Sequence, residues 1–421
     1  MKILLVTLGT DGDIDPFIAL GQELKDRNHR VILVSNDYFK DKADQFGLEF
    51  VSIGSKQDYL DVLANPDVWN RFKGFRLLVD ELILRGMRDI YEQIKILHTP
   101  DTIIVAPCFM YGARIARDKL GIPLVTVVLQ PTSIWTDDQP PTLASYPWTK
   151  FLPGFVKRNL AKGIERFYFE PLIQPETNRF RSELGLSPVD RVSTHWQYSP
   201  DLILALFPKW FGPALTHSPQ HLLFPGFVSH ENPHSAVNAE CLDFLLAGDR
   251  PIAFTAGSGH RHAQKFFQVA VEVCQKLNVR GILLTKFSAN CPTQLPKSIL
   301  HCDYAPFLSI FPKCRAVVHH GGIGTTGKAL ASGVPQLVMP MAYDQPDNAR
   351  RLKSLGIARF LNPMRFTPDN VATELDNLLG SRSVQSRCQD LAGQIDSSSA
   401  LDVACSAIES VRCRTNESLY Q

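Results

Sequence analysis

Two series of short apolar runs, separated by helical patterns, constrain the fold of this chain more than any other feature. The first series occupies residues 3–7, 30–35, 101–107 and 122–130. Runs this rich in Val, Ile and Leu are typical of strands in a parallel sheet that is buried on both faces. Helical patterns at 17–27 and 75–97 alternate with these runs, which predicts a doubly wound α/β domain.

The same pattern starts again in the second half of the chain. Its strand candidates occupy residues 251–255, 281–285, 315–319 and 335–340. A stretch dense in Pro, Gly and His separates the two series, and 421 residues are too many for one ordinary core. We therefore predict two Rossmann-like domains facing a central cleft. The predicted division is an N-terminal domain at 1–207, a linker at 208–236, a second domain at 237–382 and C-terminal helices at 383–421.

Composition excludes several classes of partner. The chain has 44 Lys and Arg against 42 Asp and Glu, so it lacks the positive field that holds a nucleic-acid backbone. The nine cysteines lie far apart, without the close pairs that bind zinc, which favours reduced thiols in a cytoplasm. The apolar run at the start is too short for a signal peptide, and no run reaches membrane-spanning length. We expect a cytoplasmic protein that binds neither nucleic acid nor metal.

The segment at 316–351 joins a buried strand to a glycine-rich turn and then to a helix. Gly321, Gly322 and Gly324 allow a ligand to approach the backbone closely. The helix that begins near Gly324 presents unpaired N–H groups and the positive end of its dipole, and Thr325 and Thr326 add hydroxyl donors. This arrangement is typical of a phosphate-binding site.

His320 comes just before this turn, where a neutral imidazole can donate a hydrogen bond to a phosphate oxygen without a metal. A purely structural interpretation is equally open on these residues alone. In that case the glycines only make a tight turn, Thr325 caps the helix, and His319 and His320 are core histidines.

Two motifs in this segment resemble the donor-binding signature of nucleotide-sugar glycosyltransferases. That signature is HHGGxGTT followed about twenty residues later by DQxxNA, and here its halves lie at 319–326 and 344–349. The chain is therefore identified as resembling the UDP-glycosyltransferase superfamily, which has the GT-B fold. The resemblance implies that the donor diphosphate contacts His320, Gly322, Thr325 and Thr326, and that Asp344 and Gln345 bind the sugar. The alternative for Asp344 is a helix N-cap.

Two further segments match the family. The sequence Tyr304-Ala305-Pro306 lies where such enzymes stack the nucleobase, although many relatives carry Trp in place of Tyr304. Gly257 and Ser258 resemble the second contact to the diphosphate. The donor implied is a UDP- or dTDP-sugar, used as a co-substrate without any other cofactor.

The sequence LGTDGDIDPF places Gly9, Thr10, Gly12 and Asp13 between the first predicted strand and the first predicted helix, where open α/β sheets bind ligands. A dinucleotide fingerprint is absent, since the GxGxxG spacing is missing and carboxylates would repel a pyrophosphate. A DxD metal motif is disfavoured because a diphosphate site lies elsewhere. In the family resembled, Asp13 occupies the position of the general base within G-x-x-G-D-x-x-P. Without the family, Asp13 would be a helix N-cap before Pro16.

The resemblance extends over nearly the whole sequence, through GDIDPFIALG, LFPKWFGP, FTAGSGH, YAPF, HHGGIGTT and DQPDNARRL. It is closest to the rhamnosyltransferases of rhamnolipid synthesis, beside sterol and antibiotic glycosyltransferases. It implies an inverting, metal-independent transfer of a hexose of glucose or rhamnose type to a hydroxyl of a hydrophobic acceptor. The acceptor would be a lipid, sterol or polyketide-like molecule bound by the N-terminal domain, and the C-terminal helices would cross back to that domain. The alternatives are a non-catalytic nucleotide-sugar-binding partner and a GT-B epimerase or phosphorylase.

Residues 148–169 mix aromatic and basic side chains in a way that has two interpretations. A basic amphipathic face can rest on an anionic membrane, which would give peripheral contact with its inner face. The interpretation favoured by burial statistics is that the aromatic side chains pack inside the acceptor domain and the basic ones are solvated.

Overall fold

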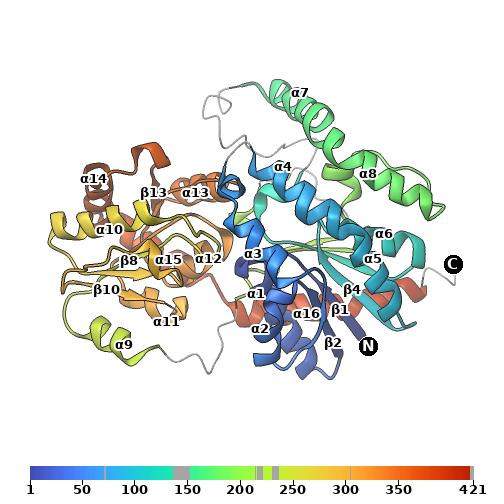
Figure 1. Ribbon diagram of the computed structural model, residues 1–421, viewed down its shortest axis with the longest axis horizontal. Coiled ribbons are helices and arrows are strands. Elements are labelled where there is room, and N and C mark those ends of the chain that lie inside the picture. The colour runs from blue at the N-terminus through green and yellow to red at the C-terminus, as the bar shows by residue number, and fades with distance from the viewer. Residues whose placement is uncertain are drawn as a thin grey trace.

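The computed structural model describes residues 1–70, 73–135, 152–213, 215, 221–229, 237–303 and 305–417. Two α/β halves lie side by side, the N-terminal one coloured blue to green and the C-terminal one yellow to orange (Figure 1). None of the helices within these ranges is both long and apolar enough to cross a membrane.

The first half is built on a sheet of seven parallel strands. In chain order they are β1 (Lys2–Val6), β2 (Arg30–Ser35), β3 (Glu49–Ser52), β4 (Thr102–Pro107), β5 (Leu124–Val128), β6 (Leu202–Ala205) and β7 (Leu222–Leu223). Their order across the sheet is β3-β2-β1-β4-β5-β6-β7, and Ile3 of β1 pairs with Val31 on one side and Ile103 on the other. The edge strand β7 lies within the segment predicted as a linker.

Helices cover both faces of this sheet. They are α1 (Asp11–Asp26), α2 (Lys40–Gln45), α3 (Lys56–Ala64), α4 (Gly74–Leu78), α5 (Arg85–Leu97), α6 (Tyr111–Leu120), α7 (Gly154–Ile164) and α8 (Glu170–Glu183). The helix predicted at 75–97 is present as one helical run, in which the π-helical turn η3 (Val79–Leu84) joins α4 to α5. The prediction that the first helix starts near residue 17 is wrong, because Thr10 caps α1 and the helix begins at Asp11.

The second half repeats the arrangement with six parallel strands in the order β10-β9-β8-β11-β12-β13. The strands are β8 (Ile252–Thr255), β9 (Gly281–Leu284), β10 (Ile299–Cys302), β11 (Ala316–His319), β12 (Gln336–Val338) and β13 (Ala358–Phe360). The helices are α9 (Ala239–Leu246), α10 (Gln264–Leu277), α11 (Phe307–Ile310), α12 (Ile323–Ala331), α13 (Gln345–Ser354), α14 (Pro368–Leu379), α15 (Arg382–Ala392) and α16 (Ser397–Glu417). The predicted pair of doubly wound parallel sheets is confirmed.

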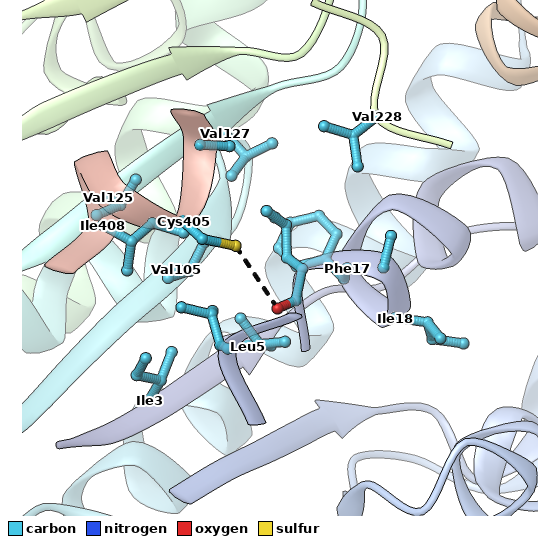
Figure 2. Close-up of a cluster of buried hydrophobic side chains, with 14 of the residues drawn as sticks. Ile3, Leu5, Phe17, Ile18, Val105, Val125, Val127, Val228, Cys405 and Ile408 are labelled. Carbon is cyan, nitrogen blue, oxygen red and sulfur yellow. Dashed lines mark hydrogen bonds between the residues drawn. The ribbon is translucent and has the colours of Figure 1, made fainter. Parts of the chain in front are cut away.

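The last helix, α16, leaves the second half and packs on the first (Figure 1). Figure 2 shows Cys405 and Ile408 of α16 in one cluster with Leu5 and Phe17, and all four side chains are fully buried. At the end of α1, Arg27 forms ion pairs with α16 at 2.5 Å and 3.1 Å. Apolar burial fixes this helix, and the ion pairs add orientation.

Candidate active site

A cleft of about 1530 Å³ is lined by residues of both halves. Both sheets reverse their strand order at the centre, between β1 and β4 and between β8 and β11. Ligands of open α/β sheets bind at such switch points, beyond the carboxyl ends of the strands. The loops that follow β1, β8 and β11 all line the cleft, so the sequence motifs of the two halves meet there.

Asp13 lies in the first turn of α1 and lines the cleft. Its Oδ2 accepts hydrogen bonds from the backbone N–H of Thr10 at 2.8 Å and from the Thr10 hydroxyl at 3.2 Å. Gly9 has φ 140°, and a Cβ there would lie 2.4 Å from this oxygen. Gly9 and Thr10 therefore form the predicted loop, whereas the prediction that Gly12 and Asp13 belong to it is corrected, since both are helical.

Asp13 is thus part of a capping box, with Thr10 rather than Asp13 at the N-cap position. Burial raises the pKa of Asp13 to about 6, and the negative charges of Asp11 and Asp15 add to the rise, whereas the bonds from Thr10 oppose it. A carboxylate with this pKa is a better proton acceptor near neutrality than an ordinary surface aspartate.

His319 and His320 differ in their surroundings. The ring of His319 accepts a hydrogen bond from the Gly321 N–H through Nδ1 at 3.1 Å, so its Nε2 donates to Gln336 Oε1 at 3.0 Å. Burial lowers the pKa of His319 to about 4. His319 is therefore a neutral structural histidine that shapes the glycine turn.

His320 lines the cleft between two glycines. A Cβ on Gly257 would lie 2.6 Å from its Cε1, and a Cβ on Gly322 would lie 2.4 Å from its Nε2. Burial, followed by the nearby His319 and His260, lowers the pKa of His320 to about 3, so the ring is neutral. Its Nδ1 is buried and has no hydrogen-bond partner among the described residues. The two loops predicted to contact the diphosphate, which carry Gly257 and Gly322, therefore both pack closely against the His320 ring.

The helix α12 presents its N-terminus to the cleft. Gly322 is the N-cap and has no side chain to accept from the first-turn N–H groups, so the alternative in which Thr325 caps this helix is wrong. Thr325 lines the cleft, whereas Thr326 is completely buried and its hydroxyl has no partner among the described residues. Of the two threonines, only Thr325 therefore has the access that a phosphate contact requires.

Asp344 and Gln345 lie at the start of α13 and both line the cleft. Asp344 occupies the N-cap position, but its side chain makes no capping bond and instead accepts from Asn348 Nδ2 at 2.6 Å. Burial raises the pKa of Asp344 to about 7, and the charge of Asp13 adds to it. The Oε1 of Gln345 accepts from the N–H groups of Met341 at 2.8 Å and Ala342 at 3.2 Å.

Asn348 connects the two halves of the donor motif, which its place in DQxxNA alone did not reveal. Besides Asp344, its Nδ2 donates to the carbonyl of Gly321 at 2.9 Å. Ser258 lines the cleft and hydrogen-bonds Asp11. Burial opposes ionisation of Asp11, but the charges of Lys42 and Lys286 outweigh it and lower the pKa of this carboxyl, and the bond from Ser258 adds a smaller part. Ala305 also lines the cleft, whereas Tyr304 lies outside the described residues.

The part of the cleft that belongs to the first half is largely apolar. Aromatic and aliphatic side chains from several elements line it, namely Leu8, Phe75, Leu78, Leu82, Phe109, Trp135, Phe169 and Ile173. Such a lining favours a ligand with a large apolar surface.

The aromatic residues at 152–169 do not all pack inside. Phe155 of α7 is 61% exposed and Phe167 is 79% exposed, whereas Phe169 lines the cleft. The favoured interpretation, in which these aromatic side chains are internal, is therefore wrong for Phe155 and Phe167. Residues 148–151 lie outside the described part of the chain.

Two family models match this chain. Residues 3–126 match the glycosyltransferase family 28 N-terminal domain. Residues 281–406 match the erythromycin biosynthesis protein CIII-like C-terminal domain. The first match spans most of β1 to β5 and the second spans β9 to β13, so β6, β7 and β8 lie outside both.

The curated relatives are also named as glycosyltransferases. A sterol 3-beta-glucosyltransferase of Arabidopsis thaliana is 28% identical over 382 residues, which are 85% of this chain and 57% of the relative. An O-mycaminosyltylonolide 6-deoxyallosyltransferase of Streptomyces fradiae is 26% identical over 427 residues, which are 97% of each chain. The chain thus spans little more than half of the plant enzyme but nearly all of the bacterial one.

Solved structures share the fold. The calicheamicin glycosyltransferase CalG4 aligns with a TM-score of 0.74 at 20% identity, over 98% of both chains. The spinosyn rhamnosyltransferase SpnG, solved with thymidine diphosphate, aligns with a TM-score of 0.67 at 18% identity, over 96% of this chain and 99% of that one. The solved structures show that the chain has the GT-B fold, and the two family models and the curated relatives indicate a glycosyltransferase.

Proposed function

We propose that this chain catalyses an inverting transfer of a hexose from a UDP- or dTDP-sugar to a hydroxyl of a hydrophobic acceptor. One observation carries the proposal. Asp13, a carboxylate whose pKa is raised to about 6, shares the cleft with His320 and the uncapped N-terminus of α12. A proton acceptor and an anion site in one cleft are what a displacement with a diphosphate leaving group requires.

The donor is proposed to bind in the C-terminal half, at 237–382. Its diphosphate would contact Gly257, Ser258, His320, Gly322 and Thr325. Thr326, which is buried, would support the glycine turn that precedes α12. Asp344 and Gln345 would bind the sugar, and Tyr304 and Ala305 the nucleobase. The solved complex of the spinosyn rhamnosyltransferase with thymidine diphosphate supports a nucleotide diphosphate here. In its most specific form, the proposal names rhamnose as the sugar that is transferred.

The acceptor is proposed to bind in the apolar part of the cleft, which belongs to the half at 1–207. The relatives named for sterol and for O-mycaminosyltylonolide support an acceptor with a bulky apolar body and a hydroxyl group. Such a molecule would gain affinity mainly by burying apolar surface against the aromatic lining.

In the proposed reaction, Asp13 removes the proton of the acceptor hydroxyl as its oxygen attacks the anomeric carbon. The bond between that carbon and the diphosphate oxygen breaks, and the nucleotide diphosphate leaves with the electron pair. The N–H groups at the start of α12 and the neutral ring of His320 would stabilise the developing charge. No metal ion is needed for any of these steps.

The proposal is tested by measuring nucleotide diphosphate release from a panel of UDP- and dTDP-sugars, with and without hydroxy-fatty-acid lipids and sterols. Release should require an acceptor and should fall by a factor of about 10² to 10⁴ in Asp13→Asn, while donor binding persists. Product stereochemistry should be inverted. Donor binding without release to any acceptor would favour a non-catalytic binding partner. An altered nucleotide sugar without net release would favour an epimerase, and a sugar phosphate formed with inorganic phosphate would favour a phosphorylase.

We also propose that α7 rests on an anionic membrane that supplies a lipid acceptor. The sequence of α7 contains three basic residues and no acidic one, and exposed Phe155 and Phe167 lie on or next to it. Native protein should sediment with vesicles that contain phosphatidylserine and much less with pure phosphatidylcholine. Phe155→Ala with Phe167→Ala should reduce that binding, whereas Met364→Ala, at an 89% exposed site in the other half, should not. Equal binding by both variants would contradict the proposal.

A further inference from the structure

The segment of α3 and the following turn η2 (Pro66–Trp69) belongs to the first half but contacts the donor loops of the second. The Tyr343 hydroxyl donates a hydrogen bond to the carbonyl of Val68, and the His262 ring lies 3.3 Å from the carbonyl of Ala64. A Cβ on Gly74 would lie 2.3 Å from the Val68 carbonyl oxygen and 3.0 Å from the Tyr343 hydroxyl. Gly74 therefore leaves the space in which this contact forms.

Trp69 is the central side chain of this contact. Its ring packs edge-on against His260, with the centroids 5.3 Å apart, and against Tyr343 at 5.8 Å. A Cβ on Gly259 would lie 3.2 Å from Trp69 Cζ2. The indole is thus fixed between the loop that follows β8, which carries Gly257 and Ser258, and the loop that leads to Asp344.

Tyr343 has an unusual backbone that serves this arrangement. Its φ is 56°, in the left-handed region that residues other than glycine rarely occupy. Local strain of this kind persists where surrounding contacts hold it, and it is concentrated at functional sites. Here it directs Tyr343 toward Trp69 while its neighbour Asp344 lines the cleft.

The indole N–H of Trp69 is an unused donor. Trp69 lines the cleft, yet its Nε1 is buried and has no hydrogen-bond partner among the described residues. A buried donor without a partner is costly, and indole N–H groups are usually paired when buried. A small turn of the ring would present this N–H to the cleft, where a hydroxyl of a bound molecule would provide the missing acceptor.

We infer that Trp69 completes the donor-sugar subsite from the opposite half, with its indole N–H donating to a hydroxyl of the sugar that Asp344 binds. Tyr343 is the positioning residue that holds the indole in place. The inference rests on the proposed function, because it requires a nucleotide sugar in the cleft. It adds a consequence: the sugar is recognised by both halves, so selection among sugars depends on the contact between them, whereas binding of the nucleotide alone does not.

The test compares Trp69→Phe, which keeps an aromatic ring and removes the N–H, with the matched control Trp210→Phe away from the cleft. Binding of UDP, UDP-glucose and each monodeoxy analogue of UDP-glucose is measured by calorimetry, and the dTDP series is used if the protein prefers it. Trp69→Phe should weaken UDP-glucose binding about threefold to tenfold and leave UDP unchanged. One monodeoxy analogue should bind to the native protein and to Trp69→Phe with equal affinity. The hydroxyl missing from that analogue is then the one that accepts the bond from Trp69. Tyr343→Phe should also weaken UDP-glucose binding, by a smaller factor, and leave UDP binding unchanged.

The outcomes separate this inference from the proposed function. If the native protein binds no UDP- or dTDP-sugar of glucose or rhamnose type, both are overturned. If it binds a donor, but Trp69→Phe weakens UDP and every analogue equally, the side chain is structural and only the inference fails. An unchanged affinity of Trp69→Phe for UDP-glucose would also overturn the inference alone.

Discussion

At the scale of single residues, the candidate site depends on a few groups held in unusual electrostatic surroundings. Asp13 and Asp344 share the cleft, and burial raises the pKa of each, to about 6 and about 7. His320 is kept neutral by burial, which lowers its pKa to about 3. The site therefore combines carboxyls that titrate near neutrality with an imidazole that does not titrate there.

The pH dependence of the reaction should follow from these shifts. A general base acts only when deprotonated, so kcat/KM should fall as the pH drops through about 6, the raised pKa of Asp13. Titration of His320 should not contribute to the pH profile above pH 5, because its ring is already neutral there. Steady-state rates between pH 4.5 and 8 check this expectation. A rate that stays flat down to pH 4.5 would contradict Asp13 as the base.

The same shift predicts an effect on stability. The pKa of Asp13 is raised from 3.8 to about 6 in the folded state, so between these values the folded state binds more protons and stability falls as pH rises. Above pH 6 the penalty is fully present. Asp13→Asn should therefore raise the free energy of unfolding at pH 7.5 by about 1–3 kcal/mol and have little effect at pH 4. Urea unfolding of native protein, Asp13→Asn and exposed Asp26→Asn checks this, and equal gains in both variants would contradict it.

A methyl group at residue 257 should disturb the donor site. Gly257 has φ 88°, and a Cβ there would lie 2.6 Å from the His320 ring. Gly257→Ala should displace that ring and lower kcat/KM by a factor of about 10², with a loss of about 1–3 kcal/mol in stability. Gly163→Ala is the control, because a Cβ at that helical position meets nothing within 4 Å. Unchanged donor affinity in Gly257→Ala would contradict the placement of the diphosphate.

At the scale of elements, α16 shows how a helix far along the chain becomes part of another domain's core. Its buried face adds Ala400, Ala404, Cys405, Ile408 and Val411 to the cluster beneath β1 and α1 (Figure 2). The helix belongs by sequence to the end of the chain but by packing to its beginning.

The two faces of α16 should respond differently to truncation. Ile408 is fully buried, so Ile408→Ala should lower the free energy of unfolding by about 2–5 kcal/mol through lost burial and a cavity. Val403 on the outer face is 38% exposed, so Val403→Ala should change it by no more than about 0.5 kcal/mol. Chemical denaturation followed by far-UV circular dichroism measures both. Equal losses would mean that α16 is not anchored on the first half.

At the scale of the whole molecule, contacts between the halves close the cleft. Lys286 of the second half lies 3.4 Å from Asp11 of the first and donates to the Tyr38 hydroxyl at 3.1 Å. Arg351 of α13 donates to the carbonyls of Phe211 at 3.0 Å and Gly212 at 2.8 Å, which precede the edge strand β7 of the first half. Arg351 therefore connects α13 of the second half directly to the backbone of the first half.

Removing the Arg351 contact should loosen the connection between the halves. Arg351→Ala deletes two bonds to backbone and the ion pair with buried Asp347 at 2.6 Å, which should cost about 1–3 kcal/mol. Amide hydrogen exchange at residues 211–212 should become faster. Arg359→Ala, which removes an exposed pair with Glu374, should cost less than about 1 kcal/mol and leave that exchange unchanged. Equal exchange in both variants would contradict the role of Arg351.

The sequence by itself determined the two parallel sheets and the turn at 319–326, because strand period, helix period and glycine spacing are local properties of the chain. It did not predict β3, β6, β7, β10 or β13, which are short, although β6 is a continuous apolar run at Leu202–Ala205 that could have indicated a strand. It also placed the start of α1 too late, since the capping box at Thr10 and Asp13 was interpreted as a loop.

Only the tertiary structure decided which local signals meet. The effect of Asp13 on the pKa of Asp344, the close approach of Gly257 to His320, and the contact of Trp69 with the second half all join residues that are far apart in the sequence. The exposure of Phe155 and Phe167 likewise depends on which elements pack beside their helices, and the residue pattern of the helix alone does not predict it. Such contacts depend on how the two halves pack against each other, and the hydrophobic periodicity within either half does not predict that packing.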